Sequence, residues 1–138
     1  MPGYSGTPLP KKLGLKPDLR VQVVSAPSDV AKELKAALGL CNPDPGPREP
    51  LDFVLWFVKT QAELKQRFPA WARRLKPAGM LWIAWPKKSS GVASDLGEGE
   101  VRAIGLAAGL VDVKVCAVSE IWSGLKFVIR LKDRPKGA

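Results

Sequence analysis

The chain has 138 residues, of which 46% are apolar and 25% charged, and this predicts one globular domain with its own core. Histidine is absent and there are two cysteines, Cys41 and Cys116. The composition therefore excludes Ser-His and Cys-His dyads, imidazole metal ligands, and zinc or iron–sulfur sites built from cysteine alone.

The net charge of +9 is concentrated at the two ends of the chain. Residues 1–20 hold four basic residues and one acidic, and residues 126–138 hold five basic and one acidic. Two interpretations stay open: solvated ends that keep the protein soluble, or basic termini that contact nucleic acid. We find no secretory leader and no apolar run of membrane-spanning length, so we expect a cytoplasmic protein with free thiols.

The single domain is expected to begin with an arm, residues 1–19, and to end with a basic flexible tail, residues 132–138. The arm contains one short helix, for which Thr7 is the predicted N-cap and Pro8 the first helical residue. Gly14 is the predicted stop of this helix.

A strand and a longer helix follow the arm. The β-branched run Arg20–Ser25 predicts the strand. The helix is expected to begin with Ser28 or Asp29 as N-cap and to stop at Gly39. Residues 42–50 are rich in proline and predict an irregular connection.

The middle of the chain predicts two buried strands, Leu51–Val58 and Met80–Trp85, because both runs are almost wholly apolar. Between them, Pro69 predicts a kink or a restart of a helix, and residues 76–79 its end. That helix has one apolar stripe, formed by Leu64, Phe68, Trp71 and Leu75.

A loop over residues 86–91 leads to a further helix. Asp95 and Glu98 form a D-x-x-E capping box, so the helix is expected to begin near Asp95.

The last two strands are expected at Val111–Val118 and Leu125–Leu131, joined as a hairpin with Trp122 and Ser123 in its turn. The order is therefore β-α-β-α-β-α-β-β, which predicts a three-layer Rossmann-like α/β domain with a mostly parallel sheet of about five strands. We expect the sheet order 1-2-3-5-4, with the last strand antiparallel and inserted.

Ligands in such sheets bind beyond the carboxyl ends of the strands, which here are Ser25–Ser28, Val58–Thr60 and Trp85–Gly91. A small anion is the expected ligand, because hydroxyls, lysines and a glycine turn gather in these segments. The candidate ligand-binding residues are Ser25, Ser28, Lys59, Lys87, Lys88, Ser89, Ser90 and Gly91.

An alternative for Lys87 and Lys88 is that they pair with the carboxylates of the following helix, Asp95, Glu98 and Glu100. Tyr4, Ser5 and Trp122 are candidates to line the same cleft. The alternative for Tyr4 and Ser5 is an N-terminal segment held down for structural reasons alone.

Four stretches carry a resemblance to a known family: YSGTPLPKKLGLKP, LDFVLWFV, LWIAWPKKSSG and GLVDVKVCAVSEIWSGLKFV. Over nearly its whole length the chain resembles an uncharacterised bacterial family built on a domain of unknown function, which implies no known activity. Its element order is also similar to the latter half of class I S-adenosylmethionine-dependent methyltransferases.

That methyltransferase class has a glycine-rich turn after the first strand and an acidic residue at the end of the second. Here the turn is Ser25-Ala26-Pro27-Ser28-Asp29, without glycine, and Pro27 lacks an N–H. We therefore expect no cofactor and no metal, and in particular no S-adenosylmethionine.

The function that these observations favour is a non-catalytic binding or regulatory module with a small-anion site. One alternative is an enzyme, a reduced S-adenosylmethionine-dependent methyltransferase, and another is a nucleic-acid-associated protein that uses its basic termini. For an enzyme, the candidate general bases include Asp52, Asp112 and Glu120. Asp52 and Asp112 begin strands, so they are expected at the edge of the sheet away from the site.

Overall fold

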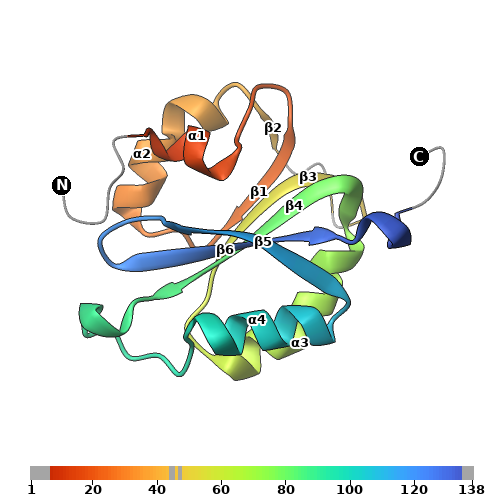
Figure 1. The fold of residues 1–138 in the computed structure, drawn as a ribbon. Helices are drawn as coiled ribbons and strands as arrows, with labels where there is room; N and C mark the ends of the chain where they lie inside the picture. The colour runs from red at the N-terminus through yellow and green to blue at the C-terminus, as the bar shows by residue number, and fades with distance from the viewer. Residues whose placement is uncertain (1–6, 44–45, 47, 135–138) are drawn as a thin grey trace.

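The computed structural model describes residues 7–43, 46 and 48–134. Apart from the short strand β2 (Asn42–Pro43), helices alternate with strands, as expected, until the final hairpin (Figure 1). In chain order the elements are α1 (Leu9–Leu13), β1 (Arg20–Val24), α2 (Ser28–Leu38), β2 (Asn42–Pro43), β3 (Leu51–Phe57), α3 (Gln61–Arg73), β4 (Leu75–Pro86), the 3₁₀ turn η1 (Lys88–Ser90), α4 (Glu98–Ala107), β5 (Leu110–Ala117), β6 (Trp122–Ile129) and the 3₁₀ turn η2 (Leu131–Asp133).

The strands form one six-stranded sheet in the order β2-β1-β3-β4-β6-β5. The predicted order of the five longer strands is confirmed: β6 is inserted between β4 and β5 and runs antiparallel to both. The sixth strand is β2, two residues long, which pairs with the beginning of β1 and was not predicted.

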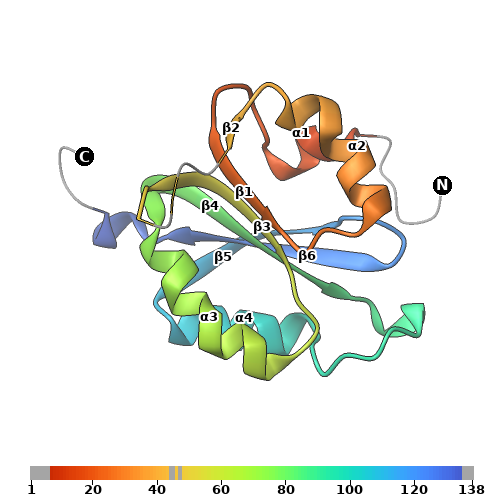
Figure 2. The ribbon, with the colours of Figure 1, turned by 180° about the vertical axis from the view of Figure 1, so that it is seen from behind.

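Helices cover both faces of the sheet, so the domain has three layers. Helices α1 and α2 lie on one face and α3 and α4 on the other, as the views from the front and from behind show (Figures 1 and 2). Strand β3 is apolar except for Asp52 because alternate side chains enter the two cores. Leu51, Val54 and Trp56 pack on the α3–α4 side, whereas Phe53 and Leu55 pack on the α1–α2 side.

The first helices begin one residue away from their predicted positions. Helix α1 starts after Pro8, not Thr7, and α2 starts at Ser28 with Pro27 in the N-cap position. Neither helix has a side-chain cap, so the N-cap predictions for Thr7 and for Ser28 or Asp29 were wrong. Proline with an extended ψ directs the chain into these helices instead.

The C-terminal ends of the first two helices agree better with the predictions from the sequence. Gly14 ends α1 in the left-handed region at φ 77°, and Gly39 follows the last residue of α2. Helix α3 continues through Pro69 without a restart. It stops at Arg73, and residues 76–79 are not its end but part of β4, where the register shifts against β3.

The predicted capping box at Asp95 and Glu98 was also wrong, because α4 begins only at Glu98 after Gly97. Asp95 instead contacts the beginning of α3: its carboxylate accepts a hydrogen bond from the backbone N–H of Gln61 at 2.8 Å. The backbone carbonyl of Asp95 accepts a second bond from the Gln61 side chain, also at 2.8 Å. Asp95 therefore caps a helix that lies earlier in the sequence.

We expect Asp95→Ala to lower the free energy of unfolding by about 1 kcal/mol, because one N–H at the start of α3 loses its acceptor. Asp95→Asn keeps an acceptor oxygen and is the matched control, with a loss below about 0.5 kcal/mol. Urea denaturation of both variants checks this, and equal losses would contradict the capping role.

The link between β5 and β6 is a tight hairpin, as predicted, but its turn is shorter than expected. Trp122 and Ser123 are the first two residues of β6, not part of the turn. The hydroxyl of Ser119 accepts hydrogen bonds from the N–H groups of Ile121 and Trp122, at 3.2 and 3.1 Å. This serine, which is buried, organises the turn and carries the strand further toward the carboxyl edge of the sheet.

Candidate functional site

A pocket of about 450 Å³ opens at the carboxyl edge of the sheet, where β1 and β3 end. The chain leaves β1 toward one face, into α2, and leaves β3 toward the other face, into α3 (Figure 1). This divergence is the switch point at which α/β sheets bind ligands. The pocket is lined by Ser25, Pro27, Phe57, Val58, Lys59, Glu63, Val92, Ile121 and Trp122.

Ser25 begins the loop after β1 in an unusual backbone conformation. Its φ is 61°, in the left-handed region that residues with a Cβ rarely adopt. Such strain costs about 1 kcal/mol or more and is most often found at functional sites. The turn bends sharply here, so Ser25 itself lines the pocket.

Two aromatic rings form the apolar wall of the pocket. Phe57, at the end of β3, and Trp122, at the beginning of β6, meet edge to face with their centroids 5.1 Å apart and an interplanar angle of 79°. The hydrogen bonds of Ser119 hold the Trp122 backbone, and Val118 and Ser119 donate their N–H groups to the Trp122 carbonyl. The wall is therefore fixed before any ligand arrives.

The charged lining residues are Lys59 and Glu63, which flank the start of α3. The Lys59 carbonyl accepts a hydrogen bond from the Ser94 hydroxyl at 2.7 Å, and this ties the loop after β3 to the loop before α4. Thr60 is the N-cap of α3 and accepts a bond from the Glu63 N–H at 3.2 Å. None of the ion pairs found among the described residues joins Lys59 to Glu63.

The structure divides the candidate residues between two places. Ser25, Lys59 and Trp122 line the pocket, whereas Ser28 and residues 87–91 do not. Tyr4 and Ser5 lie outside the described residues.

The segment from Lys87 to Gly91 forms the turn η1 and uses its polar groups internally. The Ser90 hydroxyl donates to the Lys87 carbonyl at 2.6 Å and accepts from the Val92 N–H at 3.2 Å. Gly91 has a φ of 79°, so a glycine suits this position. Ser89 and Lys88 are exposed, and the Lys88 chain lies beside Gly97, where an added Cβ would be 3.8 Å from Cε.

Sequence reasoning missed Phe57, Glu63, Val92 and Ile121 as lining residues. A T-x-x-E pattern, Thr60 to Glu63, marks a helix start and would have placed Glu63 at the same edge of the sheet. Val92 and Ile121 carried no signal, because only the fold brings their loops to this edge.

The three candidate general bases lie elsewhere. Asp52 accepts from the Arg20 N–H at 2.8 Å and from Lys76 Nζ at 3.1 Å, at the opposite edge of the sheet. Asp112 accepts a hydrogen bond from Arg102 at 2.9 Å, and the bonds that Arg102 donates, first to Asp112 and then to Glu98, raise its pKa. Glu120 is exposed in the hairpin turn. The described residues also contain no group of three side chains that could hold a metal ion.

The pocket departs from the pattern that class I methyltransferases use for a nucleoside. Strand β2 pairs only with Arg20 and Val21, so it ends well before β1 reaches Val24. Its residues Asn42 and Pro43 are not acidic, and Asp44 lies outside the described residues. The loop after β1 has no glycine, so these residues do not fit the cofactor in the way that this class holds it.

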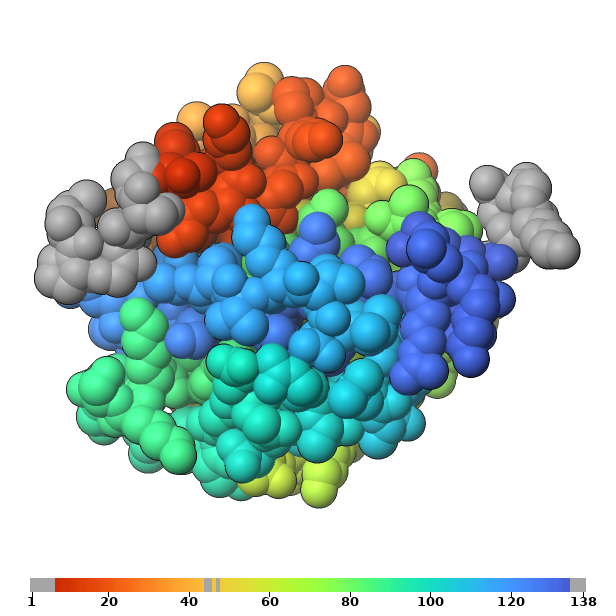
Figure 3. Space-filling model, viewed as in Figure 1, coloured from red at the N-terminus to blue at the C-terminus, as the bar shows by residue number. Residues whose placement is uncertain are grey.

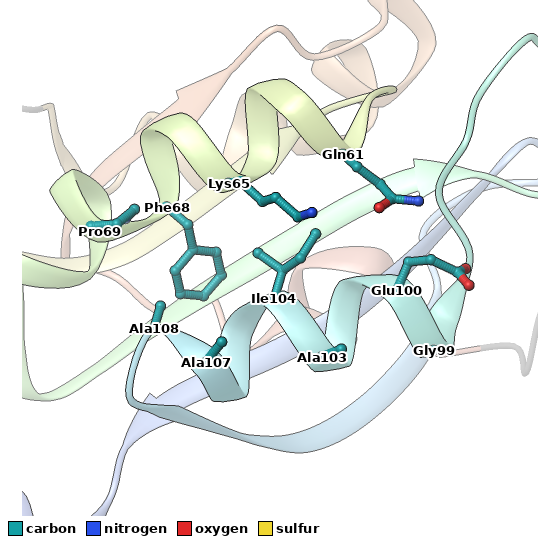
Figure 4. Close-up of a pocket in the computed structure, with 10 residues that line it drawn as sticks. All are labelled: Gln61, Lys65, Phe68, Pro69, Gly99, Glu100, Ala103, Ile104, Ala107 and Ala108. Atoms are coloured by element: carbon teal, nitrogen blue, oxygen red, sulfur yellow. The ribbon is translucent and has the colours of Figure 1, made fainter.

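A second hollow, of about 540 Å³, lies between α3 and α4 on the outside of the domain (Figure 4). Phe68 and Ile104 form its floor, and the small side chains of Ala103 and Ala107 line it on the α4 side (Figure 4). Gln61 and Glu100 stand at one end, and Lys65 extends from α3 over the middle (Figure 4). The floor of this groove is apolar, and the groove shares no lining residue with the strand-end pocket.

The fold is similar to that of solved methyltransferases. The magnesium protoporphyrin IX methyltransferase ChlM from Synechocystis PCC 6803, with bound SAH, superposes with a TM-score of 0.58 and 12% identity, covering 88% of this chain and 78% of that one. A SAM-dependent methyltransferase from Aquifex aeolicus superposes with a TM-score of 0.56 and is 20% identical in sequence, covering 87% of each chain. A putative methyltransferase from Thermoplasma acidophilum superposes with a TM-score of 0.56 and 12% identity, covering 92% of this chain and 76% of that one. At these identities the likeness establishes the fold alone.

No curated protein matches the sequence. Among the described helices, none has both the length and the apolar character needed to cross a membrane. A family model does match, over residues 10–131, and it is the one for a protein of unknown function, DUF3052. The resemblance to a domain of unknown function is thereby confirmed, and the chain belongs to the DUF3052 family.

Proposed function

We propose that the protein is a non-catalytic binding module that holds a small anionic ligand in the pocket between the ends of β1 and β3. The observation that carries this proposal is a preformed hollow at the switch point, lined by residues from five separate segments. The left-handed φ of Ser25, which lines the pocket, supports it, because strained backbone tends to cluster at ligand sites.

The lining residues favour a ligand with an apolar body and one negative group. Phe57, Trp122 and Ile121 would contact a flat apolar body, and the Lys59 ammonium would bind a carboxylate or phosphate. Glu63 would accept a hydrogen bond from a donor on the same molecule. We prefer Lys59 to Lys87 and Lys88 as the anion contact, since only Lys59 lines the pocket.

We propose a non-catalytic role because the pocket contains few groups that could act as an acid or a base. Glu63 is the sole carboxylate among the lining residues, and the chain has no histidine. A single carboxylate opposite a lysine suits binding better than a two-step proton transfer.

We expect Lys59→Gln to weaken the binding of indole-3-acetate roughly tenfold, because one charge-assisted hydrogen bond is lost. Indole-3-acetate carries an apolar body, a carboxylate and an N–H, so it matches the lining. Lys88→Gln removes an equally exposed lysine outside the pocket and should leave the affinity unchanged. Isothermal titration of both variants checks this. A tenfold loss in Lys88→Gln but none in Lys59→Gln would move the anion site to η1.

The second candidate is a reduced methyltransferase, favoured by the likeness to solved methyltransferases. The two proposals separate in a thermal shift experiment with S-adenosylmethionine and S-adenosylhomocysteine. A ligand at 100 times its dissociation constant stabilises a protein by about 2.7 kcal/mol, which is a shift of several degrees. The binding-module proposal predicts no shift with either compound.

A further inference from the structure

Lysines from three distant parts of the chain meet on one surface. Lys16 follows α1, Lys114 lies on β5 and Lys126 on β6, where Lys114 and Lys126 are opposite each other in the antiparallel ladder. We call Lys16, Lys114 and Lys126 the lysine surface. Figure 3 shows α1, in red, in direct contact with the blue hairpin strands on the viewer's side. The fold therefore joins basic residues from near both ends of the sequence.

The lysine surface is electrostatically unfavourable in the protein alone. Like charges directly opposite on neighbouring strands repel each other. Lys126 is also half-buried, facing Trp82 on β4 as well as Lys114 on β5. Its pKa is lowered, first by burial and then by the charges of Lys114 and Lys16. No acidic group is among the causes of this shift.

Hydrogen bonds hold the elements of this surface together. Lys114 Nζ donates to the Lys12 carbonyl at 3.0 Å, and Lys12 Nζ donates to the Ala117 carbonyl at 2.8 Å. An ammonium has three N–H donors, so the bond to Lys12 leaves Lys114 able to bind an anion as well. Of the lysine surface, Lys114 is thus tied to α1, and it needs little ordering on binding.

No described carboxylate neutralises these charges. Within the described part of the chain, no ion pair includes a member of the lysine surface; the pairs of Arg20, Lys76 and Arg102 lie elsewhere. An arrangement that raises the energy of the free protein is relieved when a polyanion supplies the missing negative charge.

We propose that the lysine surface binds the phosphate backbone of a duplex nucleic acid without reading its sequence. Lysine is a compact point charge that suits phosphate contacts. A single strand is disfavoured because binding it relies on exposed aromatic rings for base stacking. Among the described residues, the phenylalanines and four of the tryptophans are buried and Trp71 is half-buried on the opposite layer. This surface shares no residue with the ligand pocket, so the proposal of nucleic-acid binding can be tested independently of the proposed small-anion site.

Fluorescence anisotropy with a labelled 20-base-pair DNA, from 50 to 200 mM NaCl, tests the proposal. The triple variant K16Q/K114Q/K126Q is expected to bind at least tenfold more weakly at 50 mM NaCl. The slope of log affinity against log salt should fall by about 2 to 3, since each phosphate contact contributes about 0.9. Its melting temperature should change little, because the relief of mutual repulsion offsets the loss of the hydrogen bond from Lys114 to the Lys12 carbonyl.

K65Q/R67Q is the control, since it removes two exposed positive charges from α3 on the opposite layer. It should lower the affinity less than threefold. The proposal is overturned if the triple variant binds as tightly as the wild type, or if the control loses as much. It is equally overturned if the wild type prefers the single strand, or vesicles of phosphatidylglycerol, to the duplex.

Discussion

Gly105→Ala is expected to destabilise the protein by about 2 kcal/mol, although alanine is the better helix former by about 1 kcal/mol. A Cβ at this position of α4 would lie 2.0 Å from the Phe127 ring. The ring cannot move aside easily, because it is fully buried and packs edge to face on Phe68 at 5.3 Å. Thermal unfolding should show a melting temperature lower by roughly 5–10 °C.

Gly99→Ala in the same helix is the matched control. A Cβ there would meet no atom within 4 Å, so only the helix preference remains and the variant should be neutral or more stable by up to about 1 kcal/mol. If both alanines stabilise the protein, α4 does not pack on β6 as closely as described.

Trp82→Phe is expected to lower the free energy of unfolding by about 3 kcal/mol. The buried indole N–H of Trp82 donates to the Leu13 carbonyl at 2.9 Å, and this carbonyl lies in the last turn of α1, where no helical partner exists. Phenylalanine leaves the carbonyl unpaired and the core underfilled. Chemical denaturation measures the loss, and cleavage by protease should begin near α1.

Trp56→Phe makes the same chemical change at a site without the hydrogen bond. The Trp56 Nε1 is buried and has no hydrogen-bond partner among the described residues. Removing an unsatisfied donor offsets part of the lost packing, so we expect a cost of about 1 kcal/mol or less. Equal costs for the two tryptophans would show that the Leu13 contact contributes nothing.

The order of elements and of the longer strands was predictable because it follows from strong, local signals. The runs at Leu51–Val58 and Met80–Trp85 are too apolar for any strand that is not covered on both faces. Right-handed crossovers then leave few possible arrangements of the sheet.

The role of Asp95 could not be predicted because its decisive partner is distant in the sequence. Asp95 looked like the cap of the helix that follows it, yet it binds Gln61, which is 34 residues away. The short strand β2 was missed for a similar reason. It contains Pro43 and depends on pairing with Arg20 and Val21 rather than on a propensity of its own.

The location of the pocket was predictable, but its lining was not. Strand direction alone places Ser25 and Lys59 at the carboxyl edge. Whether Lys87 and Lys88 line the same hollow depends on the course of one loop. Lys87 donates its N–H to the carbonyl of the lining residue Ile121, but neither lysine is itself part of the lining.

The central proposal is that the strand-end pocket binds small amphipathic anions and does not accept a nucleoside. The most direct measurement follows ¹H–¹⁵N resonances of the full chain during parallel titrations with indole-3-acetate and S-adenosylhomocysteine. We predict that indole-3-acetate moves the amides of Ser25 and Lys59 and the indole N–H of Trp122, and that S-adenosylhomocysteine moves none of them. Saturable shifts of those resonances with S-adenosylhomocysteine, and none with indole-3-acetate, would contradict the proposal.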